Sequence, residues 1–262
     1  MKHLAIALLL SLTGFPALAD EPPVLVETPS LADAVASGAV PPVAQRVPRQ
    51  PMVAGEAPGR PGGDLRVLMA GPKDTRLMVV YGYARLVGYT PDLTFASDLA
   101  KSVDIDEDRV FTFHLREGHK WSDGKPFTAE DFRYWYEDVA LNPELSPSGL
   151  VRELLPKGEK PRVEFPDLLT IRYSWTHPNP LFLPALAGPS PLYLYQPAHY
   201  LKQFHAKYAD KDKLAELVKQ RKQRNWVALY NRLDNAYRND NPDLPSLEPW
   251  VLETRPPADR FV

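Results

Sequence analysis

Proline is the feature that most limits the folds open to this chain. The sequence has 29 prolines among 262 residues, about twice the usual share of ~5%. Each proline lacks a backbone N–H donor, so a helix bundle or a wide, continuous sheet is disfavoured. Hydrophobic residues make up 44% of the chain, which is enough for one large globular domain or two small ones.

Cysteine content and net charge exclude several classes of function. The chain has no cysteine, which excludes disulfide scaffolds, thiolate metal sites and cysteine nucleophiles. The formal net charge is -2 at pH 7. The chain as a whole therefore has no bulk attraction to nucleic acid or anionic lipid, and we expect no nucleic-acid partner.

The N-terminus has the three parts of a secretory signal peptide. Lys2 precedes the apolar run Leu4–Leu12, and Ala17-Leu18-Ala19 provides an A-x-A cleavage site. A membrane anchor is the alternative, but the run is shorter than the ~20 residues that a span needs. No cysteine follows that could carry a lipid. We therefore expect a signal peptide at residues 1–19, no membrane insertion and a periplasmic location.

Residues 20–61 are a proline-rich leader. Proline restricts its own φ and favours extended conformations in the preceding residue. We therefore expect an extended tether, with one or two helical turns at most in Leu31–Ser37.

The folded domain is predicted to begin at Gly62 and to continue to Val262. An alternating pattern predicts a strand at Leu65–Met69, and an apolar, aromatic stretch predicts a helix from Arg76 to Arg85. Val110–Leu115 is rich in β-branched and aromatic residues, which predicts a strand.

A capped helix is predicted after an Asp-Gly turn at residues 123–124. Thr128 is the expected N-cap, and Asp131 occupies the N3 position of a capping-box-like start. An apolar face follows with the spacing i, i+3, i+4 and i+7, made of Phe132, Trp135, Tyr136 and Val139.

The remaining chain is predicted to contain one more strand and three helical faces. The strand is Leu168–Trp175, and Pro178–Pro191 is a loop or a short broken helix. The three helical faces are Tyr200, Leu201, Phe204 and Tyr208; Leu214, Leu217 and Val218; and Trp226, Leu229, Tyr230 and Leu233.

No catalytic or metal-binding motif stands out. His199 and His205 are six residues apart, which places them on different faces of a helix. Asp104–Asp108 resembles half of a calcium loop, but Arg109 occupies the position that requires glycine, so we interpret it as a solvated acidic turn. The basic run Lys219–Arg224 is interpreted as the solvated end of a helix, where cations are favourable.

The segment Phe111–Phe132 reads FTFHLREGHKWSDGKPFTAEDF. It resembles the signature of the family 5 extracellular solute-binding proteins, the periplasmic receptors of oligopeptide, dipeptide and nickel ABC importers. The resemblance extends to the signal peptide, the Gly-Gly-Asp-Leu-Arg stretch at Gly62, the proline-rich passage near Leu181 and the final segment Pro256–Val262.

This resemblance implies an α/β fold of the periplasmic binding protein-like class II type. Family members are usually about twice as long, so the chain is expected to be lobe I, with the second lobe missing. Lobe I would have two subdomains, one made of about 62–86 and 173–262 and the other of about 87–172.

The function implied by the resemblance is solute capture in the periplasm and delivery to the permease of an ABC importer. A peptide, or a related small solute, is the expected ligand, and the receptor is expected to be a monomer with no enzymatic activity and no cofactor. Two alternatives remain open. One is an exported chaperone-like or enzyme-like protein that acts through lobe I alone, and the other is a receptor for a nickel chelate or haem.

The ligand contacts are expected in the segment Gly71–Tyr83, because ligands in open α/β sheets lie beyond the carboxyl ends of strands. The residues expected to bind the ligand are Met78, Tyr81 and Tyr83. In the signature, the residues expected to be structural are Trp121, Asp123 and Thr128.

Overall fold

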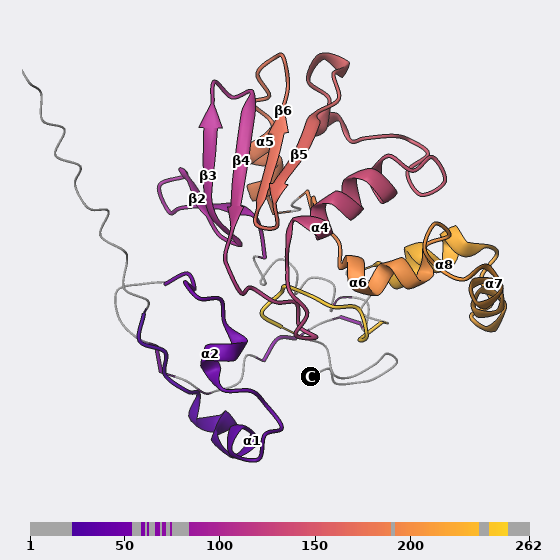
Figure 1. The fold of residues 1–262 in the computed structure, drawn as a ribbon. Helices are drawn as coiled ribbons and strands as arrows, with labels where there is room; N and C mark the ends of the chain where they lie inside the picture. The colour runs from indigo at the N-terminus through magenta and orange to yellow at the C-terminus, as the bar shows by residue number, and fades with distance from the viewer. Residues whose placement is uncertain are drawn as a thin grey trace, which may run out of the picture.

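The structure is a computed structural model that describes residues 23–53, 59–60, 62, 66–68, 70–71, 74, 84–189, 192–235 and 241–250. Figure 1 shows a sheet with one long helix beside it, a group of helices on one side and the short N-terminal helices on another. Within the described residues, no helix is both long and apolar enough to cross a membrane.

A four-stranded antiparallel sheet forms the centre of the described structure (Figure 1). Its strands, in spatial order, are β3 (Ala100–Asp106), β4 (Val110–Leu115), β6 (Thr170–Ser174) and β5 (Arg162–Asp167). The central strands β4 and β6 confirm the two strands predicted in these regions. The edge strands β3 and β5 were not predicted, because their more polar sequences lack the β-branched and aromatic enrichment of a buried strand.

A two-stranded hairpin precedes this sheet in the chain. It pairs β1 (Val87–Tyr89) with β2 (Phe95–Ser97) in antiparallel register. At its base, the N–H of Leu99 donates to the carbonyl of Arg85 at 2.8 Å, so the hairpin leads directly into β3.

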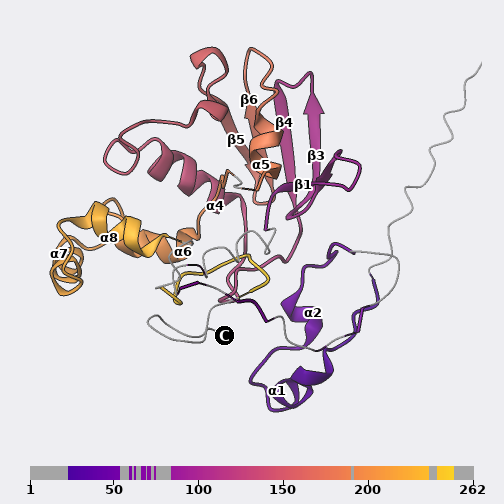
Figure 2. The ribbon, with the colours of Figure 1, turned by 180° about the vertical axis from the view of Figure 1, so that it is seen from behind.

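The core is built around Phe182, on helix α5 (Phe182–Ala187), which packs on one face of the sheet (Figure 2). The Phe182 ring lies 5.0 Å from the ring of Phe111 and 5.3 Å from that of Tyr173. All three side chains are buried. The helix lies within Pro178–Pro191, so the prediction of a loop or short broken helix there is confirmed in its helical form.

The predicted helix cap is confirmed. Helix α4 (Ala129–Arg133) begins after Thr128, whose hydroxyl accepts from the N–H of Glu130 at 3.3 Å. In return, the N–H of Thr128 donates to the carboxylate of Asp131 at 3.0 Å, which completes the capping box.

The helix continues as a π-helical segment, η3 (Tyr134–Ala140). Its wider turn is visible in the bond from the N–H of Leu141 to the carbonyl of Tyr136 at 3.1 Å. Because a π-helix has more residues per turn than an α-helix, the buried face shifts. Tyr134 and Asp138 are buried here, whereas Trp135 is only half-buried, so the predicted apolar face is correct in part.

Short helices make up the rest of the described chain. The 3-10 turns η4 (Arg152–Leu154) and η5 (Pro156–Gly158) connect α4–η3 to β5. The three predicted helical faces are found on α6 (Ala198–Leu201) with η6 (Lys202–Phe204), on α7 (Lys211–Gln220) and on α8 (Trp226–Leu233). Figure 1 shows α7 and α8 projecting from one side of the molecule.

The described part of the leader, residues 23–53, is more helical than we expected. The helical turns allowed in Leu31–Ser37 are confirmed by α1 (Ala32–Ala36), which follows η1 (Pro29–Leu31), but a further helix, α2 (Val43–Arg46), takes the place of an extended tether. Glu27 holds these turns together, because its carboxylate accepts from the N–H of Val43 at 2.9 Å and pairs with Arg46. Proline density alone does not reveal such a carboxylate bridge, whose partners are far apart in sequence.

Two predicted elements fall largely outside the described residues. The helix expected at Arg76–Arg85 is described only at residues 84–85, which are not helical. Of the strand expected at Leu65–Met69, residues 66–68 are described and are not in a strand. For these three residues the prediction is wrong, because an alternating pattern forms a strand only where a neighbouring strand provides hydrogen bonds.

Candidate functional site

The residues expected to bind the ligand, Met78, Tyr81 and Tyr83, lie outside the described residues. The described chain resumes at Ala84, directly after the expected ligand segment. Ala84 and the next two residues are buried.

Two hydrogen bonds anchor the chain at Ala84 and Arg85. The hydroxyl of Tyr195 donates to the carbonyl of Ala84 at 3.2 Å, and the guanidinium of Arg85 donates to the carbonyl of Gly188 at 2.8 Å. Tyr195 is itself buried against the ring of Trp121, with ring centroids 6.0 Å apart. The residues that follow the expected ligand segment, Ala84 and Arg85, are therefore attached to the chain around α5, and through Tyr195 to the signature.

Two carboxyl groups lie beside this anchor. Burial raises the pKa of Glu248 and that of Asp98, and the charge of each is partly offset by Arg85. The hydroxyl of Tyr193 donates to one oxygen of Glu248 at 3.3 Å, whereas the other oxygen is buried without a hydrogen-bond partner in the described structure. This region of the site is thus rich in hydrogen-bond acceptors. Sequence reasoning missed Glu248, because nothing near it in the sequence marks it.

The signature residues form a structural joint. Asp131 is buried, and its carboxylate accepts from the indole N–H of Trp121 at 3.2 Å and from the N–H of Ala198 at 3.0 Å. Asp123, in the turn, pairs with His199 at 2.7 Å. Trp121, Asp123 and Thr128 thus each bond to a group elsewhere in the chain, and their structural role stays a prediction.

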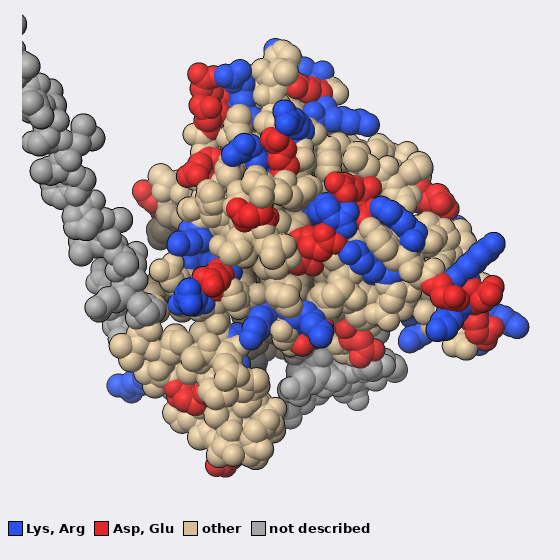
Figure 3. Space-filling model, viewed as in Figure 1, with Lys and Arg blue, Asp and Glu red and all other residues tan. Residues whose placement is uncertain are grey.

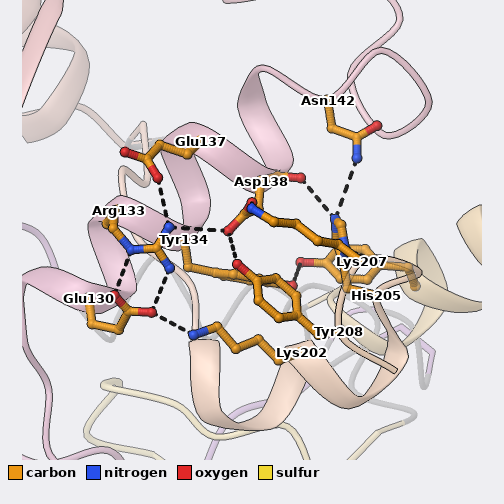
Figure 4. A network of polar contacts seen from close by, with 11 residues as sticks. Glu130, Arg133, Tyr134, Glu137, Asp138, Asn142, Lys202, His205, Lys207 and Tyr208 are labelled. Atoms are coloured by element: carbon orange, nitrogen blue, oxygen red, sulfur yellow. Dashed lines mark hydrogen bonds and ion pairs between the residues drawn. The ribbon is translucent and has the colours of Figure 1, made fainter. Parts of the chain in front are cut away.

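A network of charged groups joins the signature helix to the chain after α6 (Figure 4). Both carboxylate oxygens of Glu130 accept from the Arg133 guanidinium at 2.7 Å, and one of them also pairs with Lys202 at 2.5 Å. Hydrogen bonds from Arg133 hold the pKa of Glu130 at about 2. The same guanidinium pairs with Glu137 at 2.7 Å.

The buried member of this network is Asp138, on η3 (Figure 4). Its side chain pairs with Lys207 and accepts from the hydroxyl of Tyr208 at 2.6 Å. Burial favours the neutral carboxyl, but these bonds prevail and lower the pKa of Asp138. Nearby, His205 accepts the N–H of Lys207 at 3.1 Å, so its Nε2–H donates to the carbonyl of Asp138 at 2.9 Å. Each charge has a partner, so the network acts as a rigid connection.

Two shallow pockets lie elsewhere on the described surface. One of about 310 Å³ lies between the leader and the sheet, lined by Arg49, Gln50, Lys101, Leu115, Arg116, Glu117 and Leu169. The other, of about 250 Å³, lies beside α4 and is lined by Ala129, Glu130, Arg133, Phe165, Asp167 and Leu168. Across the described ranges, no group of three or more histidine or acidic side chains is arranged to hold a metal ion. In the acidic turn, Asp104 instead pairs with His114 at 2.9 Å.

Comparison with known proteins identifies the family. Residues 94–262 match the family described as bacterial extracellular solute-binding proteins, family 5 Middle. The periplasmic alpha-galactoside-binding protein of Rhizobium meliloti (strain 1021) is 30% identical over 256 residues, covering 87% of this chain and 34% of that protein. The periplasmic oligopeptide-binding protein OppA of Escherichia coli (strain K12) is 35% identical over 108 residues, covering 36% of this chain and 20% of that protein.

Solved structures give the same fold. An oligopeptide-binding protein OppA superposes with a TM-score of 0.81 at 32% sequence identity, over 94% of this chain and 38% of that one. The periplasmic binding protein MelB of Agrobacterium fabrum C58, solved with stachyose, gives a TM-score of 0.59 at 24% identity over 90% of this chain and 37% of that one. The chain thus spans about a third of the length of these relatives and has the α/β fold of part of a lobe in such proteins. It belongs to the family 5 bacterial extracellular solute-binding proteins.

Proposed function

We propose that this chain takes part in solute capture in the periplasm for an ABC importer, with a peptide as the solute. The observation that carries the proposal is the superposition on an oligopeptide-binding protein, with a TM-score of 0.81 over 94% of this chain. The sequence identity over this superposition is 32%. Capture would involve closure of two lobes over the ligand, a hinge motion that presents the closed form to the permease.

A saccharide is the second candidate ligand. It is favoured by the match to the alpha-galactoside-binding protein, which extends over 87% of this chain at 30% identity. Peptides and oligosaccharides both present many hydrogen-bond donors and acceptors. The acceptor-rich region at Asp98 and Glu248 is compatible with either ligand.

The remaining features of the proposal concern location and domain organisation. Residues 1–19 would direct export to the periplasm, where the named relatives act, and 20–61 would be a leader. The folded part, 62–262, would divide into subdomains of about 62–86 with 173–262 and of about 87–172. Since β6 is Thr170–Ser174, the proposed boundary at about 172–173 falls within this strand.

These relatives are named for binding oligopeptides or saccharides. They therefore favour neither a chaperone-like or enzyme-like protein nor a receptor for a nickel chelate or haem. The permease partner follows from the family. The ligand contacts Met78, Tyr81 and Tyr83 stay a proposal that binding experiments can test.

Thermal unfolding of the periplasm-purified protein, with and without ligand, tests the proposal. Trialanine and raffinose are the two probes. A rise in Tm with trialanine supports peptide capture, and a rise with raffinose alone selects the saccharide instead. No shift with either, or with mixed short peptides, would overturn solute capture.

The contact residues are tested with a matched pair of tyrosine variants. Tyr81→Ala should weaken binding of the effective probe by at least about tenfold, the cost of losing one well-placed aromatic contact. Tyr89→Ala, on the exposed face of the β1–β2 hairpin where the Tyr89 side chain is 46% exposed, should leave binding unchanged. Equal affinities for both variants would contradict the assignment of Tyr81.

A further inference from the structure

The basic run Lys219–Arg224 has no role in the proposed site. The side chains of Lys219, Arg221, Lys222 and Arg224 are all exposed. None of the four forms an ion pair with the residues that the structure describes. We call these four residues the basic tip.

The acidic residues of α7 do not neutralise the basic tip. Asp210 lies at the opposite end of the helix, where its carboxylate caps the first turn by accepting from the N–H of Asp212 at 3.1 Å and of Lys213 at 2.9 Å. Glu216 accepts from the amide of Gln220 at 3.1 Å. Charges of both signs alternate over the first turn of α7, whereas all four charged residues from 219 to 224 are basic.

The backbone holds the basic tip in one conformation. The N–H of Gln223 donates to the carbonyl of Val218 at 2.9 Å, and the N–H of Lys222 donates to that of Lys219 at 3.0 Å. This pair of bonds is the Schellman motif, which ends a helix with a residue in the left-handed conformation. That residue is Lys222, with φ of 52°.

A lysine at this position is unfavourable for the fold. Glycine is the usual residue there, because a Cβ clashes with the backbone in the left-handed conformation. The chain thus retains an exposed cation where glycine would relieve strain. Lys157 has a similar φ of 51°, so what distinguishes Lys222 is its place among three other exposed cations.

The position of the basic tip makes it accessible to a large partner. The α7–α8 pair projects from the body of the molecule (Figure 1), and Lys and Arg side chains lie at the outer rim of this projection, with Asp and Glu side chains among them (Figure 3). Neither of the two pockets described above includes a residue of the basic tip. Four cations on a convex surface fit a planar array of negative charges better than a single small anion.

We propose that the basic tip docks the protein on an anionic phospholipid surface. The attraction is local, so it is compatible with a net charge of -2 for the whole chain, because charges more than about 8 Å away are largely screened at physiological salt. The tip has no exposed apolar side chain among its four residues, so the contact is peripheral and involves no insertion. The inference rests on the proposed function for its location, since an importer receptor works beside the membrane.

Co-sedimentation of the periplasm-purified protein with vesicles tests this docking. One set of vesicles contains phosphatidylcholine with phosphatidylglycerol, and the other contains phosphatidylcholine alone. The natural protein should partition at least about tenfold more strongly onto the anionic vesicles, and added salt should remove the difference. The variant K219Q/R221Q/K222Q/R224Q should lose at least about tenfold of this partitioning.

A matched control removes the same charge elsewhere. The variant K101Q/K125Q/K157Q/K160Q replaces four exposed lysines and should bind anionic vesicles as the natural protein does. A second variant, Lys222→Gly, relieves the backbone strain, so it should be at least as stable as the natural protein and yet bind the vesicles more weakly.

Three results would overturn the docking proposal. These are equal partitioning onto both kinds of vesicle, equal losses in the tip and control variants, and binding to polyglutamate without binding to vesicles, which would indicate an acidic protein partner. Solute-induced shifts in Tm are measured on the same variants. If they are absent from the natural protein while vesicle binding persists, the proposed solute function fails and the docking surface stands.

Discussion

At the scale of single residues, the buried acidic side chain of Asp131 connects the signature to the start of helix α6. Asp131 is 3% exposed, and its two oxygens serve three donors: Trp121, Thr128 and Ala198. Burial raises the pKa of Asp131, whereas these bonds act in the opposite direction. Asp131 therefore stabilises the fold mainly by accepting hydrogen bonds from donors that would otherwise be buried without partners.

The first prediction concerns Asp131→Ala. Each buried donor left without an acceptor costs about 1–3 kcal/mol, so the variant should lose roughly 3 kcal/mol of unfolding free energy, measured by urea denaturation. Asp104→Ala is the control, because the Asp104 side chain is 75% exposed and pairs only with His114, and such pairs are worth about 0–1 kcal/mol. Similar losses of unfolding free energy in both variants would show that the hydrogen bonds of Asp131 do not stabilise the fold.

The second prediction concerns acid stability. Hydrogen bonds from Arg133, opposed by burial and aided by Lys202, lower the pKa of Glu130 from 4.5 to about 2. An acid with a lowered folded-state pKa stabilises the fold above its unfolded pKa, and this stabilisation is lost as the pH falls from about 4.5 to about 2. Glu130→Gln should therefore flatten the decline in urea midpoint over this range.

The size of this effect should be small and dependent on salt. The Glu130 side chain is 38% exposed, so solvent screens its ion pairs. The difference between Glu130→Gln and the natural protein should shrink as salt is added. A decline of identical slope in both proteins, at low salt, would rule out a contribution from Glu130.

Residues were predictable from sequence where their partners are near in the chain. Thr128 and Asp131 were identified correctly because a capping box is complete within four residues. Asp138 and Glu248 were not, since Asp138 pairs with Lys207, and Glu248 bonds to Tyr193. Such pairs depend on the tertiary fold, and neither residue has a distinguishing local pattern.

At the scale of elements, hydrophobic pattern predicted the central strands and the helical faces but not the helix type. The π-helical turn of η3 buries Asp138, which a regular 3.6-residue period would not require. The turn between β3 and β4 lies in the predicted acidic turn, but the sequence did not predict its backbone conformation. Its central residues, Glu107 and Asp108, have φ of 48° and 52°, which fits the primed turns favoured in tight hairpins.

The third prediction concerns this turn. A residue with a Cβ pays about 1–2 kcal/mol in the left-handed conformation, so Asp108→Gly should stabilise the protein by about 1 kcal/mol in urea denaturation. The main-chain bond from Asn179 to the carbonyl of Asp108, at 2.7 Å, is retained in the variant. Asp108→Ala is the opposing control and should destabilise the protein, because alanine tolerates this conformation less well than aspartate. The same sign of change in both variants would contradict the strain argument.

At the scale of the whole molecule, hydrogen bonds tie together segments that are distant in sequence. The turn after Trp121 is bonded to the C-terminal loop, with the N–H of Ser122 donating to the carbonyl of Ser246 at 2.9 Å. The leader is attached to the same region, with the N–H of Arg49 donating to the carbonyl of Glu117 at 2.9 Å. Composition predicted a leader here, but its attachment depends on backbone groups that carry no sequence signal.

The fourth prediction tests this attachment through Arg116. Its guanidinium donates to the carbonyl of Gln50 in the leader at 3.0 Å, and to the carbonyls of Asp98 and Ala100 in the body at 3.2–3.3 Å. In Arg116→Ala, the leader loses the hydrogen bond between this guanidinium and Gln50, which we call the clamp. Trypsin cleavage at Arg46 and Arg49 should therefore become several-fold faster, as followed by mass spectrometry.

Two comparisons separate release of the leader from general unfolding. Arg152→Ala removes an arginine whose side chain is 85% exposed, and its cleavage rate at Arg46 should match that of the natural protein. Tryptophan fluorescence of Arg116→Ala should keep a cooperative thermal transition, because the joint at Trp121 and Asp131 does not involve Arg116. Faster cleavage with this transition intact would show that the leader is held by the clamp, and an unchanged cleavage rate would show that the main-chain bond at Arg49 is sufficient to hold it.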